Sequence, residues 1–171
     1  LPISFVLFLV LFLIGRTHIF PWIAHPTPKR GMWLTSRWMF GRDLVALVAV
    51  YSLAITFVLN DLKPDLAAVR DQVTGWRRGL YDRIVGGYKG TPEDELAIKH
   101  KLSRLGTGLI VLWGWTFSLL AFDLLMSLEP YWASNLFGAF VFIGDFLSGM
   151  TSTGLLMVYW RGKLGAQDVI G

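Results

Sequence analysis

The chain has no cysteine and only three histidines in 171 residues. The absence of cysteine excludes disulfides, thiolate-bound zinc and protein-ligated iron–sulfur clusters from this chain. A metal or haem would therefore depend on His18, His25 and His100, and none of these lies within an apolar run. We expect this chain to bind no metal or redox cofactor of its own.

Several signatures of enzymes and nucleic-acid-binding proteins are also missing. The sequence has no nucleophile–base pair, phosphate-binding loop or metal-ligand spacing, so we do not expect a free-standing enzyme. The formal net charge of +4 is small, and the lysines and arginines lie outside the apolar stretches. That distribution suits lipid headgroups better than nucleic acid.

The chain is rich in apolar sequence. Hydrophobic residues make up 54% of it, with eight tryptophans and twelve phenylalanines, which is too apolar for an ordinary soluble domain. We predict an all-α, polytopic membrane helical bundle with about four transmembrane helices and an amphipathic extramembrane helix. Residues 1–59 would hold two spans and an aromatic and basic interfacial loop, 60–106 an extramembrane helical insert, and 107–171 a transmembrane hairpin.

The first apolar run, at 1–14, is shorter than the roughly 20 residues that a span needs. We interpret it as a truncated first span. Because it has no starting Met, basic region or cleavage site, we expect a fragment of a longer chain rather than a signal peptide. The cations and aromatic residues that follow are typical of interfacial anchors, namely Arg16, His18, Trp22, Trp33 and Trp38.

Residues 44–59 form the predicted second span, with Asp43 placed to cap its N-terminus. The aromatic segment before it, at 32–40, is expected at the level of the lipid headgroups. In the insert, apolar residues recur at intervals of three and four over 62–84, which predicts one amphipathic helix. Thr91 then begins a further helix that we expect to run into the third span.

Lysine and arginine predict the orientation of the chain. The side that holds the 60–106 insert and the tail after Tyr159 carries eleven of them, and the other side carries five. By the positive-inside rule, the insert and the C-terminus should be cytoplasmic. The Glu129–Pro130 turn should lie outside.

The hairpin carries one carboxylate in each of its two predicted spans. Residues 107–128 contain Asp123, and residues 136–159 contain Asp145. A charge in hydrocarbon costs roughly 2.5 to 3.5 kcal/mol on insertion scales, so both side chains should face protein or a wet cavity. With a rise of about 1.5 Å per residue, Asp123 lies roughly 9 Å inward of Glu129, and Asp145 lies near the midplane.

These carboxylates share helix faces with hydroxyl groups, an arrangement that suits the uptake and release of protons. One interpretation is a proton half-channel that opens to the outer side. Its candidate residues are Glu129, Asp123, Asp145, Ser148, Ser152 and Thr116. Two alternatives are that the aspartates hold helices together through hydrogen bonds, or that one contacts a quinone ring.

A family resemblance rests on three stretches of sequence. Phe122-Asp-Leu-Leu-Met-Ser-Leu-Glu-Pro-Tyr-Trp-Ala-Ser-Asn-Leu-Phe-Gly is followed by Phe142-Ile-Gly, and Arg16-Thr-His-Ile-Phe-Pro-Trp-Ile-Ala-His-Pro lies upstream. With Trp33-Leu and Arg42, they resemble the ActF membrane subunit of alternative complex III, a bacterial quinol:cytochrome c oxidoreductase. That subunit is related to polysulfide-reductase-type membrane subunits. The resemblance covers most of the chain outside 60–106.

The resemblance implies a multi-pass subunit of the bacterial inner membrane, in a respiratory complex that oxidises quinol. It implies iron–sulfur and haem subunits and lipid as partners, no cofactor in this chain, a polar proton path, and any quinone at a subunit interface. Members of the family are longer and have more spans, so the resemblance implies a partial chain or a reduced relative. Tyr131 stands where many relatives have His, and the insert has no counterpart.

Three classes of function remain open. The first is a respiratory membrane subunit with a proton path. The second is a scaffold, in which each aspartate would have a fixed hydrogen-bond partner. The third is half of a transporter or channel, which would require a discontinuous helix at the midplane.

Overall fold

The computed structural model describes residues 2–24, 33–129 and 131–164. Throughout these ranges the regular elements are all helices, which confirms the all-α prediction. Three helical segments are long and apolar enough to cross a membrane, and they are Ser36–Asp61, Pro92–Leu128 and Phe137–Arg161. These correspond to the second, third and fourth predicted spans.

The N-terminal apolar run is helical as well. It consists of α1 (Pro2–Val10), a π-helical turn (Leu11–Gly15) and α2 (Arg16–Ile19), and α3 (Pro21–Ala24) follows. Its apolar stretch is shorter than the three candidate spans. A fourth span therefore stays a prediction.

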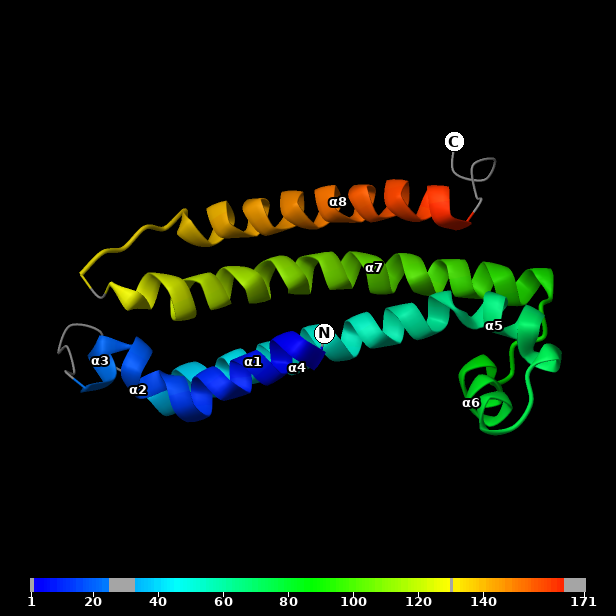
Figure 1. Ribbon diagram of the computed structural model, residues 1–171, viewed down its shortest axis with the longest axis horizontal. Coiled ribbons are helices and arrows are strands. Elements are labelled where there is room, and N and C mark those ends of the chain that lie inside the picture. The colour runs from blue at the N-terminus through cyan, green and yellow to red at the C-terminus, as the bar shows by residue number, and fades with distance from the viewer. Residues whose placement is uncertain (1, 25–32, 130, 165–171) are drawn as a thin grey trace.

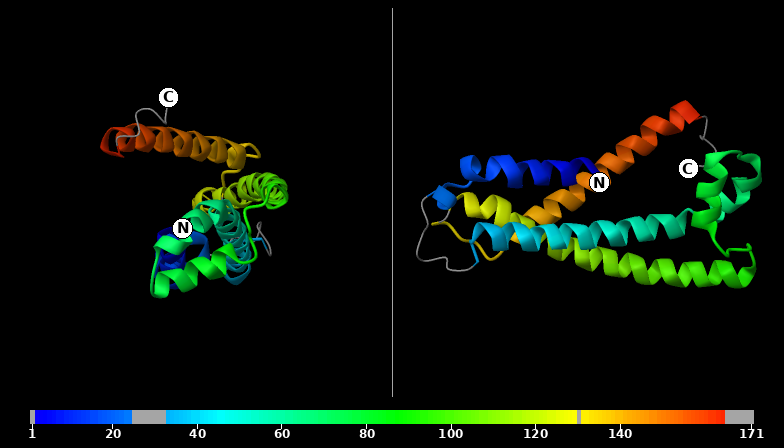
Figure 2. Two further views of the ribbon diagram at one scale, coloured as in Figure 1. Left: turned by 90° about the vertical axis from the view of Figure 1, so that its right-hand side faces the viewer. Right: turned by 90° about the horizontal axis from the view of Figure 1, so that it is seen from below.

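The three long helices form the body of the molecule (Figure 1). α4 (Ser36–Asp61) packs along α7 (Pro92–Leu120), and α8 (Phe137–Leu164) lies on the other side of α7. Figure 2 shows that the C-terminal half of α8 points away from α7. After Gly138, no described residue of α8 is buried. Two helices are thus packed along their length, and the third is attached mainly near its N-terminus.

An aromatic cluster fixes the N-terminal helices on α4. Phe40 lies at its centre, and its ring has three aromatic neighbours, with centroids 5.9 Å away in Phe8, 4.9 Å in Phe12 and 5.7 Å in Phe20. Met39 is buried beside it. Both residues belong to the 32–40 segment, one face of which packs inward. The depth of this segment at the headgroup level stays a prediction. Met32 lies outside the described residues.

α4 begins earlier than the sequence predicts. Thr35 holds the N-cap position, so Asp43 lies two turns inside the helix. The prediction that Asp43 caps the span is therefore wrong. The contacts of Met39 and Phe40 stabilise helical structure N-terminal to the apolar run, and propensity alone does not reveal such tertiary contacts.

Residues 62–84 of the insert do not form one amphipathic helix. The insert contains α5 (Lys63–Val69), a 3-10 turn (Arg70–Gln72) and α6 (Trp76–Val85). Gly75 precedes α6 with φ of 72°, a conformation that favours glycine and interrupts the helix. The apolar spacing continues across this break, so periodicity missed it. The two short helices pack on each other at the insert end of α4 (Figure 1).

α7 begins as the sequence predicts. The Thr91 hydroxyl accepts a hydrogen bond from the backbone N–H of Asp94 at 3.2 Å, and Pro92 lies in the first turn. After Leu120 the segment continues through a π-helical turn (Ala121–Leu125) and a 3-10 turn (Met126–Leu128). One continuous helical segment therefore joins the insert to the buried carboxylate at Asp123.

Gly138 is where α8 approaches α7 closely. A Cβ atom at this position would lie 2.8 Å from Cε2 of Phe122 and 3.1 Å from Cβ of Ser118. Gly138→Ala should therefore lower the free energy of unfolding by about 1–3 kcal/mol, measured by SDS titration of the detergent-solubilised protein. Gly144→Ala is the matched control, because its Cβ would meet no described atom within 4 Å. Equal unfolding curves for the two variants would contradict this contact.

Candidate functional site

A bidentate ion pair joins α4 to the end of the α7 segment. Arg42 Nε donates to Oδ2 of Asp123 at 2.7 Å, and Arg42 Nη2 donates to Oδ1 of the same carboxylate. Arg42 Nη1 donates to the backbone oxygen of Trp33 at 3.0 Å, and the guanidinium carbon lies 3.7 Å from the Trp33 ring centroid. Because the planar fork of arginine matches a carboxylate, Asp123 is held in one orientation.

Asp123 lies in the π-helical turn, a feature that is frequent at functional sites. The Ser127 hydroxyl donates to the backbone oxygen of Asp123. Thr116, Asp123 and Ser127 are all at most 1% exposed, which confirms that they share a protected face of the segment. This face meets α4 at Arg42.

Asp43 is the third ionisable member of the site. Its side chain is fully buried and interacts electrostatically with Asp123 and Arg42. While both carboxyls are ionised, neither oxygen of Asp43 has a hydrogen-bond donor among the described residues. The Asp43 carboxyl lies within hydrogen-bonding reach of Asp123, so one proton can be shared between the two. We call Arg42, Asp43 and Asp123 the Arg42 cluster. With all three groups ionised its net charge is −1, and a single bound proton makes it neutral.

The Thr116 hydroxyl is buried and also has no hydrogen-bond partner among the described residues. An unsatisfied buried polar group costs about 1–3 kcal/mol. Such a group therefore marks a place for a water molecule or for a polar atom of a neighbouring helix. Thr116 lies on the face that carries Asp123, further along the membrane-spanning part of α7.

The structure brings together only some of the residues predicted for the proton path. Asp123 and Thr116 are buried on the α4-facing side of α7, whereas Glu129 is exposed at the end of the 3-10 turn. On α8, three predicted residues are exposed, namely Asp145, Ser148 and Ser152. Within the described part of the chain, Asp145 has no hydrogen bond or ion pair, so a link between it and Asp123 stays a prediction. Pro130, of the predicted turn, lies outside the described residues.

The predicted interfacial anchors have different surroundings. Trp22 is buried in the aromatic cluster, and Trp33 is stacked on Arg42. His18 and Trp38 are exposed. The Arg16 guanidinium lies 5.4 Å from the ring centroid of Phe12. His25 is outside the described residues.

Sequence reasoning missed Arg42 and Asp43 as site residues. The sequence predicts Asp43 as a helix cap, and Arg42 enters only as its neighbour and as one of the residues of the family resemblance. Arg42 and Asp123 are separated by 81 positions, so no local pattern joins them. The available signal was an Arg-Asp pair directly before an apolar run, which is an unusual place for two charges if the helix begins earlier.

No protein-family model, curated protein or solved structure matches this chain. Among the described residues, no group of three His, Asp or Glu side chains is placed to hold a metal ion.

An apolar hollow of about 470 Å³ lies between α1, α4 and α7. The hydroxyl groups of Ser4 and Tyr51, at its edge, are 2.6 Å apart and hydrogen-bonded. The rest of the lining is apolar, formed by Val50, Ala54, Leu109, Ile110, Trp113 and Phe117. The hollow suits a hydrocarbon chain rather than a polar ligand.

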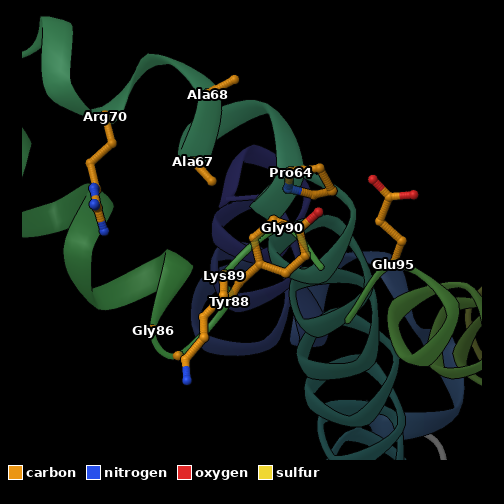
Figure 3. A pocket seen from close by; sticks show the side chains of 10 residues that line it. Pro64, Ala67, Ala68, Arg70, Gly86, Tyr88, Lys89, Gly90 and Glu95 are labelled. Carbon is orange, nitrogen blue, oxygen red and sulfur yellow. The ribbon is translucent and has the colours of Figure 1, made fainter. Parts of the chain in front are cut away.

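A second hollow, of about 650 Å³, lies in the insert and is shown in Figure 3. The Tyr88 ring lies near Pro64, and the side chains of Arg70 and Glu95 lie on opposite sides of this ring. Burial, followed by the nearby carboxylates of Glu95 and Asp94, raises the pKa of Tyr88 above its usual value. Tyr88 is therefore a neutral phenol at physiological pH. Positive and negative groups are mixed around this hollow, so its charge favours no one class of ligand.

Proposed function

We propose that this chain is an integral membrane subunit of a quinol-oxidising respiratory electron-transfer complex of the bacterial inner membrane, similar to alternative complex III. The subunit would hold no redox centre, would contribute to a proton path, and would assemble with iron–sulfur and haem subunits. Two lines support the proposal: the sequence resemblance around Phe122–Gly138, and three apolar helices that suit a membrane protein. The observation that carries the proton path is the Arg42 cluster.

Buried ionisable groups in membrane-spanning helices are expensive and are usually functional. In the Arg42 cluster one fixed cation faces two carboxyl groups, so the site can gain or lose one proton while its charge changes only between 0 and −1. A group with this property can pass protons one at a time. Trp33 and the aromatic cluster shield it on the α4 side.

The proposed path begins at the exposed carboxylate of Glu129 and reaches Asp123 in the Arg42 cluster. Thr116, with its unpartnered buried hydroxyl, would extend the path along α7. Asp145, with Ser148 and Ser152, would carry it further once a neighbouring helix covers α8. The orientation with the insert and C-terminus in the cytoplasm makes Glu129 the outer end.

A scaffold is the second candidate function. One observation favours it, because both oxygens of Asp123 are bonded to Arg42, as expected for a carboxylate that pairs two helices. The lack of a described donor for Asp43 favours the proton path instead, because a purely structural pair gains nothing from a second buried carboxyl. The two functions therefore differ in what Asp43 does.

The test is Asp43→Asn in the intact complex, reconstituted in vesicles, with proton uptake measured per quinol oxidised. The variant keeps the size of the side chain and leaves the Arg42–Asp123 pair in place. We expect fewer protons per quinol, with the complex still assembled. The control is Asp61→Asn, an exposed carboxylate at the end of the same helix, which should leave the ratio unchanged. An unchanged ratio in Asp43→Asn would favour the scaffold.

A further inference from the structure

Asp145 lies deep in a helix face that nothing in the described chain covers. It follows the start of the candidate span, Phe137, by eight residues, which is about 12 Å into a hydrocarbon core roughly 30 Å thick. Its short side chain cannot reach the membrane surface from there, unlike the long side chain of a lysine. A carboxylate in this position therefore needs a partner.

Three hydroxyl groups of α8 do not need one. The hydroxyls of Ser148, Thr151 and Thr153 each donate to the backbone oxygen four residues earlier at 2.8 Å. Serine and threonine in membrane helices are commonly satisfied in this way. Asp145 is thus the group of α8 that most needs a partner from another chain.

Small residues share a helix face with Asp145, at intervals of three, four and seven. They are Ser148, Gly149 and Ser152. Together with Asp145, we call them the Asp145 face. A Cβ atom on Gly149 would meet no described atom within 4 Å, so the face has room for close approach. Small residues of this kind allow two membrane helices to pack closely.

We propose that the Asp145 face binds a transmembrane helix of a partner subunit that places an arginine or lysine opposite Asp145. The choice of partner rests on charge complementarity, because the carboxylate of Asp145 is best stabilised by a cation. The chain uses the same solution at another intramembrane aspartate, Asp123, which is paired with Arg42 from a separate helix. A second copy of α8 in a symmetric pair would place two Asp145 carboxylates together, which repel. Lipid alone would leave the charge in hydrocarbon.

This proposal does not rest on the respiratory role, because it uses only depth, exposure and charge. It also explains why α8 is unburied after Gly138 and points away from α7 (Figure 2). A helix that leaves its own bundle has a surface free for another subunit. The partner helix would complete the protein environment of Asp145.

Photo-crosslinking in the native membrane tests the proposal. A diazirine-bearing amino acid is placed at Ser152, on the Asp145 face, and in a second variant at Leu147, which points to the opposite side of α8. Adducts are identified by mass spectrometry. We expect Ser152 to give a peptide from an apolar helix of another subunit, with Arg or Lys within its membrane-spanning stretch, and Leu147 to give mainly lipid.

Adding Asp145→Asn to the Ser152 crosslinker should lower the yield of that adduct about tenfold or more, because the partner cation loses its counter-charge. Three results would overturn the proposal: lipid adducts only at Ser152, an adduct with a second copy of this chain, or an adduct with a helix that has no basic residue in its span. An adduct yield that does not respond to Asp145→Asn would overturn the charge pairing. The yield is read in the assembled membrane, and the adduct from Leu147 reports whether the variant chain is inserted.

Discussion

Replacing Arg42 by glutamine should lower the free energy of unfolding by about 3–5 kcal/mol. The variant leaves Asp43 and Asp123 buried together without a cation. It also removes the hydrogen bond to the Trp33 backbone oxygen and the stacking on its ring. The measurement is the SDS concentration at half-unfolding, followed by circular dichroism.

Arg37→Gln is the matched control for this prediction. Arg37 lies on the same helix, one and a half turns earlier, but is exposed. Its replacement should change the free energy of unfolding by less than about 1 kcal/mol. The double variant Arg42→Gln/Asp123→Asn should recover part of the loss, because it removes a buried charge together with its partner. If Arg42→Gln and Arg37→Gln unfold alike, the buried ion pair is not a major source of stability.

Replacing Phe40 by alanine should lower the free energy of unfolding by about 3–5 kcal/mol. Phe40 is 1% exposed, and its ring contacts aromatic rings from three segments that lie before α4. Truncation leaves a cavity at the point where the N-terminal helices meet α4. In a membrane this loss is chiefly one of packing, because lipid solvates an apolar side chain as well as the protein does.

Phe140→Ala is the control for Phe40→Ala, since Phe140 is 75% exposed on α8. It removes the same side chain from a membrane helix without opening a cavity inside the chain. We expect a change of less than about 1 kcal/mol, measured by the same SDS titration. A second readout is protease cleavage near α2 and α3, which should accelerate in Phe40→Ala alone. Equal behaviour of the two variants would contradict the central position of Phe40.

The membrane-spanning helices were predictable because length and apolarity are local properties of the sequence. The apolar runs at 44–59 and 107–128 each lie within a helical segment of the structure, and the run at 136–159 does so from Phe137 onward. The cap at Thr91 was equally local, since one side chain and one backbone N–H three residues later decide it. Both of these predictions depend on neighbours in sequence, and both were confirmed.

The errors occur where residues distant in sequence decide the structure. Asp43 was taken as a cap because the contacts that extend α4 to Ser36 come from the N-terminal helices. The pairing of Arg42 with Asp123 needs the packing of α4 on α7, which no local pattern encodes. At Gly75 the reason was different, because apolar periodicity outweighed the conformational freedom of one glycine.

The ion pair between α4 and α7 also imposes an order on membrane insertion. Arg42 is synthesised 81 residues before Asp123, which at ribosomal speeds of about 5–20 residues per second is a delay of roughly 4–16 s. During that interval α4 has its arginine and Asp43 but not the second carboxylate. Until Asp123 is made, burial of Arg42 in lipid lacks part of its counter-charge, which costs free energy. The full stability of α4 in the membrane therefore depends on a segment that the ribosome has yet to make.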